Sequence, residues 1–101
     1  MNTSVISRHD QLQAMARLMK VIAHPVKLEI LQLLGANGAM DVSTLCAHIG
    51  AGCEISMMSH HLAKMRDNGV LLSEKKGKQV FYNLVDKRIL KVFDCFEQIN
   101  S

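Results

Sequence analysis

Polar and basic side chains that could contact a ligand are concentrated between Glu54 and Tyr82. Near the start of this stretch, Met58, Leu62 and Met65 are spaced four and then three residues apart, which predicts a helix with one apolar face. The other sides of this helix would carry Ile55, Ser56, Met57, Ser59, His60 and Lys64. One face is therefore expected to pack against the protein, while these side chains remain available to a partner.

A basic hairpin is predicted directly after this helix. Asn68-Gly69 ends the helix, because glycine adopts the left-handed conformation at low cost. The apolar segments 70–72 and 80–82 then predict two strands, and the cations at the tip between them are Lys75, Lys76 and Lys78. Lysines placed near phosphates release condensed counterions. A helix followed by a cationic hairpin therefore predicts a recognition helix with a β-wing, and a polyanion as the partner.

Length and composition indicate one globular domain over residues 1–101. The chain is 49% hydrophobic and 21% charged, with a net charge of +3, and the basic excess lies in residues 64–88. No apolar run approaches the roughly 20 residues that span a bilayer, so we expect no membrane association. The first twenty residues lack a basic start followed by an apolar core, which favours the cytoplasm.

Apolar spacing predicts four more helices around this centre. The first covers residues 8–23 and ends before Pro25, since the residue preceding a proline avoids the helical region. The second runs from Val26 to Leu34 and is closed by glycines at 35 and 38. A short third helix, capped by Asp41 or Ser43, would pair with the recognition helix as a helix-turn-helix. The last helix follows Asp86.

The first and last helices carry apolar stripes that the helix-turn-helix and wing do not need. Their members are Leu12, Met15, Met19, Ile22, Ile89, Phe93 and Phe96. A chain of this length has a modest core, so we expect both stripes to form a homodimer interface. The alternative is that they only cover the core of the monomer.

Three segments, in this order and spacing, together resemble the ArsR/SmtB family of bacterial winged-helix transcriptional repressors. Residues 23–31 (AHPVKLEIL) are similar to the family's second-helix signature, residues 58–62 (MSHHL) to its recognition-helix core, and residues 78–84 (KQVFYNL) to its second wing strand. The resemblance implies a mostly α (α+β) winged helix-turn-helix with five helices and a two-stranded wing. It also implies a homodimer that binds a palindromic operator in double-stranded DNA and releases it when an inducer arrives.

A recognition helix places its N-terminal residues nearest the base edges of the major groove. Base contact is therefore expected from the start of the helix, with Lys64 one turn later at a phosphate. Ser56 could instead be the N-cap, in place of Glu54, because the turn at residues 51–53 is about two residues longer than is usual in the family. His61 follows Met58 by three residues and is expected to pack inward.

No metal site or cofactor is expected. Many members of the family bind metals through cysteines at the start of the third helix, but the corresponding residues here are Asp41 and Ser43, which offer no soft thiolate. The last helix contains no histidine, and zinc usually takes about four nitrogen or sulfur ligands from a protein.

The cysteines are expected to be free thiols. The chain has an odd number of cysteines, namely Cys46, Cys53 and Cys95, and it lacks an export signal. Both observations argue against a disulfide framework. Cys53 lies near a helix start, where the dipole favours thiolate, so it is the candidate for a redox-responsive regulator. The alternative is that the thiols are simply packed.

Other classes of function have less support. The sequence contains no glycine-rich phosphate loop, nucleophile elbow or His-Glu-x-x-His motif, so neither catalytic residues nor an enzymatic activity are predicted. A winged-helix module that binds another protein remains open. The sequence identifies no inducer.

Overall fold

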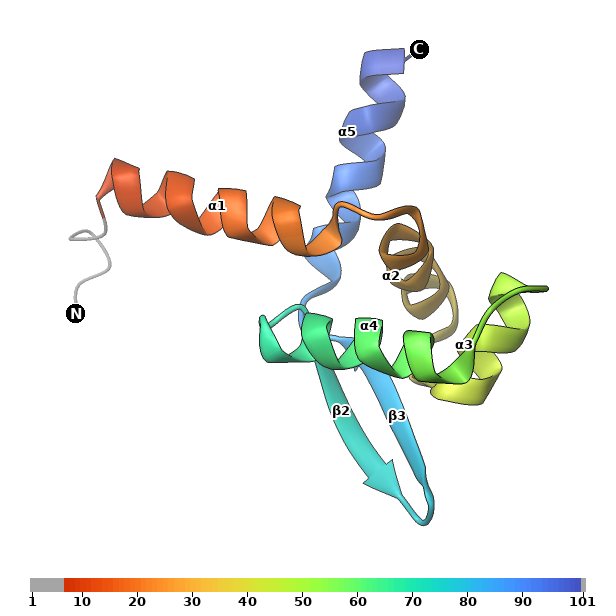
Figure 1. Ribbon diagram of the computed structural model, residues 1–101. Coiled ribbons are helices and arrows are strands. Elements are labelled where there is room, and N and C mark those ends of the chain that lie inside the picture. The colour runs from red at the N-terminus through yellow and green to blue at the C-terminus, as the bar shows by residue number, and fades with distance from the viewer. Residues whose placement is uncertain (1–6, 101) are drawn as a thin grey trace.

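The computed structural model describes residues 7–100 and consists of five α-helices, a short 3-10 helix and a small antiparallel sheet (Figure 1). The elements in chain order are α1 (Arg8–Ile22), α2 (Pro25–Asn37), β1 (Met40–Asp41), α3 (Val42–Ile49), α4 (Ile55–Asp67), β2 (Leu71–Lys76), β3 (Gln79–Leu84), η2 (Lys87–Leu90) and α5 (Lys91–Asn100). The winged helix-turn-helix with five helices is confirmed. The six residues at the start of the segment searched for an export signal lie outside the described range.

Polar side chains and proline define where the first two helices begin. The Ser7 hydroxyl accepts a hydrogen bond from the backbone N–H of Asp10 at 3.0 Å and caps α1. Pro25 occupies the first turn of α2, where no backbone N–H is needed. The Nδ1 atom of His24 accepts the N–H of Val26 at 3.1 Å. Both helices therefore start where the sequence predicted, within one residue.

Helix α2 is longer than predicted and continues through Gly35 to Asn37. A Cβ atom at Gly35 would lie 2.6 Å from the Cδ1 atom of Leu90. Gly35 therefore serves close packing of η2 on α2 rather than helix termination. The terminating residue is Gly38, with φ +78° and its N–H bonded to the carbonyl of Leu34.

The sheet has three strands in the order β1-β3-β2, one more than expected. Met40 pairs with Tyr82, and Asp41 pairs with Phe81. A two-residue strand is too short to show alternation in the sequence, which explains why it was missed. The wing hairpin closes on Gly77 and Lys78 between the paired residues Lys76 and Gln79, with Gly77 at φ +63°.

The N-caps of α3 and α4 are Asp41 and Glu54, and neither side chain makes a capping hydrogen bond. Asp41 is buried, and its Oδ2 atom accepts a hydrogen bond from Nε2 of Gln79 at 3.0 Å. This bond fastens the start of α3 to the wing. Ser56 lies inside α4, so the reading of Ser56 as the helix start is wrong.

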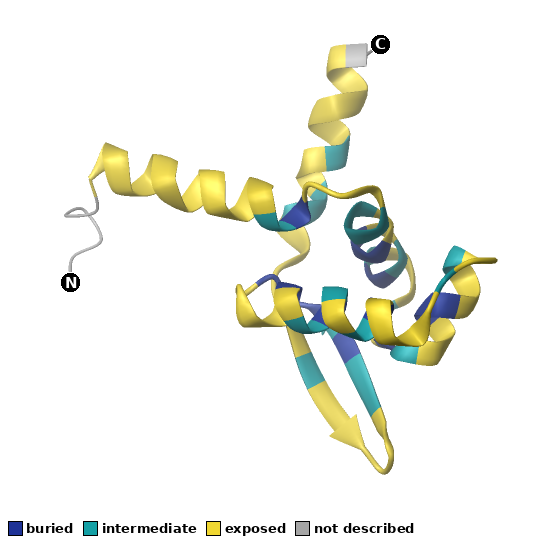
Figure 2. Ribbon diagram, viewed as in Figure 1, coloured by how far each residue is buried: buried dark blue, intermediate teal, exposed yellow. Residues whose placement is uncertain are grey.

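The core lies between α2, α3, α4 and the base of the sheet, and α1 and α5 extend away from it with mostly exposed surfaces (Figure 2). Its fully buried side chains are Ile30, Leu31, Leu34, Leu45, Met58, Leu62, Met65 and Leu71. The predicted last helix begins instead as η2, where the carboxylate of Asp86 accepts the N–H of Arg88 at 2.9 Å. No helix within residues 7–100 has the length and apolar character required to cross a membrane.

Candidate nucleic-acid interface

Helix α4 presents a polar surface on the side opposite its packed face. Met58, Leu62 and Met65 are at most 1% exposed. Ser56, His60 and Lys64 are exposed on the outer side, four residues apart. Ile55 and Met57 are each 50% exposed, and Ser59 is half-buried. The structure therefore places the predicted reading residues on the accessible sides of one helix.

His61 lies on the side of α4 that faces the start of α2. Its ring centroid is 5.1 Å from that of His24 and 6.4 Å from that of His60. Partial burial, reinforced by the charges of His24, Lys27 and His60, lowers the pKa of His61 below its usual value of 6.5. His61 therefore packs against another element, as predicted, in a locally positive environment.

The lysines of the wing differ in how available their charge is to a partner. The Nζ atom of Lys76 lies 3.9 Å from Oε1 of Glu74 and 5.6 Å from the centroid of the Phe81 ring. Lys75 and Lys78 are exposed, and the structure gives neither an ion pair within residues 7–100. These two lysines therefore offer the more available positive charge at the wing.

Each acidic residue of the basic segment 64–88 is paired with a neighbour. The pairs are Asp67 with Arg66 at 3.1 Å, Glu74 with Lys76 at 3.9 Å, and Asp86 with Arg88 at 2.6 Å. The last contact lowers the pKa of Asp86 to about 2, chiefly through side-chain hydrogen bonds from Arg88. The cations left without an ion pair in this segment are Lys64, Lys75, Lys78 and Lys87, and three of these four belong to α4 or the wing.

Two cysteines form a disulfide, which corrects the expectation of free thiols. Cys46 of α3 is bonded to Cys53 in the turn that precedes α4, with a Cα–Cα separation of 5.6 Å. The turn can bring these residues together because Gly50 and Gly52 adopt φ values of +102° and +89°. Cys95 is free and exposed. Counting cysteines could not reveal the pair, since the decision depends on the path of the glycine turn.

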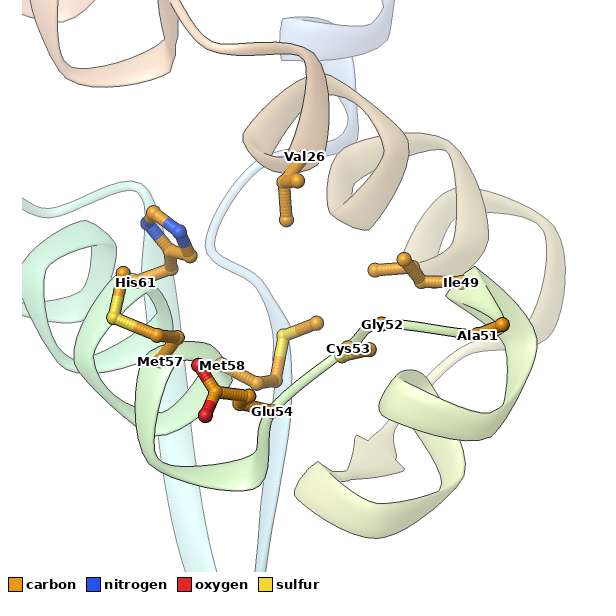
Figure 3. A pocket seen from close by; sticks show the side chains of 9 residues that line it. All are labelled: Val26, Ile49, Ala51, Gly52, Cys53, Glu54, Met57, Met58 and His61. Carbon is orange, nitrogen blue, oxygen red and sulfur yellow. The ribbon is translucent and has the colours of Figure 1, made fainter.

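Cys53 lines a small, largely apolar pocket between α2, the α3–α4 turn and the start of α4 (Figure 3). The pocket has a volume of about 270 Å³ and is lined by Val26, Ile49, Ala51, Gly52, Cys53, Glu54, Met57, Met58 and His61. Cys53 is half-buried, whereas Cys46 is only 7% exposed. A reagent that reaches the disulfide from this pocket would therefore meet Cys53 first.

Among residues 7–100, no three His, Cys, Asp or Glu side chains are grouped so that they could hold a metal ion. Asp41, at one position of the family's thiolate site, is engaged with Gln79. The expectation of no metal-dependent response remains a prediction.

Sequence reasoning missed one feature of the surface, a groove lined by cations from α1, α2 and α4. Arg17 and Lys20 are three residues apart on α1 and hence lie on neighbouring positions of one helix surface. That spacing is the one sign of the groove in the sequence. The contribution of Lys27 depends on how α2 packs and could not be read from the sequence.

No family model matches the sequence. The chain is 31% identical over 93 residues to the HTH-type transcriptional regulator YgaV of Escherichia coli, covering 88% of this chain and 92% of that protein. It is 37% identical over 68 residues to the arsenical resistance operon repressor of Escherichia coli, covering 67% of this chain and 56% of the repressor.

Solved structures show the same fold. One of them is the homodimeric winged helix-turn-helix DNA-binding domain of a Mycobacterium bovis protein, named as a possible ArsR-family regulator. It superimposes with a TM-score of 0.75 at 20% identity, covering 99% of this chain and 90% of that domain.

Proposed function

Because the chain belongs to the ArsR/SmtB family of winged-helix transcriptional regulators, we propose that it binds a palindromic DNA operator as a homodimer and represses transcription there. The observation that carries the proposal is the polar outer side of α4 beside a wing with two available lysines. The relatives are transcriptional regulators rather than enzymes. A protein that acts on the bacterial chromosome would work in the cytoplasm.

The proposed roles follow from position on α4 and the wing. Ser56, Ser59 and His60 lie in the half of α4 that would enter the major groove first, where they could hydrogen-bond to base edges. Ile55 and Met57 could contact thymine methyl groups beside them. Cations further along would contact phosphates, and these are Lys64, Lys75, Lys76 and Lys78.

The proposed dimer uses the exposed apolar surfaces of the two terminal helices. Leu12, Met15 and Met19 on α1 are 51–56% exposed, and Phe96 on α5 is 66% exposed. Burying one such side chain contributes roughly 1.5 to 3 kcal/mol. Support also comes from the homodimeric state of the Mycobacterium bovis domain.

The predicted interface needs one correction and one adjustment. Ile22 is only 5% exposed and belongs to the core of the protomer, so it is left out of the interface. Ile89 and Phe93 are half-buried against the same core and could contribute only their outer edges.

A second candidate function, a response to thiols, is favoured by the disulfide. A thiolate entering the pocket would attack Sγ of Cys53, form a mixed disulfide there and release Cys46 as a thiolate that then takes up a proton. A second thiol would resolve the mixed disulfide and leave both cysteines reduced. The turn before α4 would then lose its cross-link, which could change how α4 is presented to DNA.

The test begins by selecting genomic fragments that bind the purified protein, which defines the operator. Dissociation constants are then measured on operator and on random duplex DNA for the native chain, His60→Ala and Lys75→Ala. We expect His60→Ala to lose roughly 1 to 3 kcal/mol of discrimination. Lys75→Ala should weaken binding to both DNAs alike, because phosphates carry no sequence information. Equal losses on both DNAs for His60→Ala would contradict the assigned reading face.

A further inference from the structure

A second concentration of positive charge lies where the outer side of α4 approaches α1 and α2. The groove where α1, the start of α2 and the second half of α4 meet has a volume of about 320 Å³. Its lining residues are Arg17, Lys20, Val21, Lys27, Lys64 and Asn68. Four of the six are cationic and none is acidic. Three separate elements therefore bring like charges to one concave surface.

These cations lack the ion pairs seen elsewhere in the chain. Within residues 7–100, the structure gives no ion pair to Arg17, Lys20, Lys27 or Lys64. Asn68 makes internal contacts, because both its Nδ2 atom and its backbone N–H donate hydrogen bonds to the carbonyl of Lys64, at 2.8 and 3.1 Å. Like charges held together without counter-charges repel one another. An anionic partner bound in the groove would neutralise these charges and remove the repulsion.

The charge of Lys27 also affects the pKa of a neighbouring side chain, His61. His61 lies next to this groove on α4, and the charges of His24, Lys27 and His60 add to the effect of burial in lowering its pKa. Lys27 therefore contributes positive charge both to the groove and to the surroundings of His61.

Two cations of the groove lie outside the apolar stripe of α1 that the proposed dimer would bury. A helix turns about 100° per residue, so Arg17 lies on the opposite side of α1 from Met15 and Met19. Burial of that apolar stripe against a second copy leaves Arg17 exposed. Lys64, which also lines the groove, follows His60 by one turn on the outer side of α4. Arg17 and Lys64 therefore lie outside the apolar stripe assigned to the interface, and Lys64 joins the groove to the outer side of α4.

We propose that this groove binds backbone phosphates of the operator next to the bases read by α4, so that the DNA footprint extends onto α1 and α2. The inference rests on the proposed function and deepens it. Arginine can contact a phosphate with two parallel hydrogen bonds, and lysines add point charges around it. These contacts fix the position of the protein on DNA and do not read sequence.

The test measures how affinity for the operator depends on salt. Each phosphate contact contributes about 0.9 to the slope of log affinity against log salt concentration. The proposed dimer presents two grooves to one operator, so the double variant Lys20→Gln/Lys27→Gln removes four phosphate contacts and is expected to have a slope smaller by about 3.6. Between 50 and 200 mM salt, the affinity of the native chain should therefore fall by a factor about 150 times larger than the factor for the variant. The control Lys87→Gln/Lys91→Gln removes the same charge from η2 and α5 and should keep the native slope.

A native slope in the groove variant, or an equal reduction in the control, would overturn the inference. So would evidence for a small anion instead: inorganic phosphate raising the melting temperature of the native chain but not of the groove variant, while both bind DNA with the same slope. Melting curves without DNA check that both variants fold.

The same measurements separate this inference from the proposed function. The groove variant should keep the native preference for operator over random DNA, whereas His60→Ala should lose it. Failure of the native chain to prefer any DNA would overturn both proposals.

Discussion

Breaking the bond between Cys46 and Cys53 is expected to lower the stability of the protein. The bond closes a loop with a sequence separation of 7. In the chain-entropy description, closing a loop of this size removes about 8 cal/mol/K from the unfolded chain, or about 2.4 kcal/mol at 25 °C. For a domain of this length, that loss corresponds to a decrease in melting temperature of roughly 10 to 19 °C.

The assay is urea unfolding followed by circular dichroism, with and without a phosphine reductant. Protein concentration is held fixed, because the stability of a dimer depends on it. Cys53→Ser cannot form the bond, so the reductant should not change its unfolding midpoint. Cys95→Ser keeps the bond and should respond like the native chain. Cys53 is replaced rather than Cys46, which is only 7% exposed and where a serine would bury a hydroxyl group.

Equal free energies of unfolding for the native chain in both conditions would refute the reasoning, provided that mass spectrometry shows the bond present before reduction and absent after it. A response of Cys53→Ser to the reductant would also refute it, since the effect would then come from elsewhere in the chain.

Three further predictions concern assembly, pH and metals. Met19→Glu should shift a homodimer toward monomers in sedimentation, whereas Gln13→Glu, at another exposed position of α1, should not; a native chain that is monomeric at micromolar concentration would contradict the dimer. Because the pKa of His61 is lowered from 6.5 by folding, the unfolded chain binds more protons, so stability should be full above pH 6.5 and decrease as pH falls toward the folded-state pKa. His61→Gln should remove that part of the pH dependence in unfolding titrations. Stoichiometric zinc, cadmium or arsenite should leave operator affinity unchanged, because Asp41 and Ser43 occupy the family's thiolate positions; metal-induced release in a binding titration would show a site elsewhere.

The sequence was sufficient to predict the helix-turn-helix and the wing because their signals are local. The spacing of Met58, Leu62 and Met65 determines which side of α4 packs, and it therefore also determines which side remains exposed. Gly77 and the apolar segments on either side of it similarly predict the hairpin and its basic tip. These patterns can be recognised without the rest of the chain, because the spacing of apolar residues within each helix or strand is set by that element alone.

Tertiary structure decided the features that depend on distances between elements. The apolar pattern of α1 could not separate Ile22, which packs in the core, from Met19, which remains exposed. The disulfide depends on the path of the turn between α3 and α4. Residue spacing within one helix or strand is fixed by backbone geometry, whereas contacts between elements depend on how their surfaces pack. For that reason the sequence determined the exposed face of α4, and only the packed structure brought Arg17, Lys27 and Lys64 to one groove.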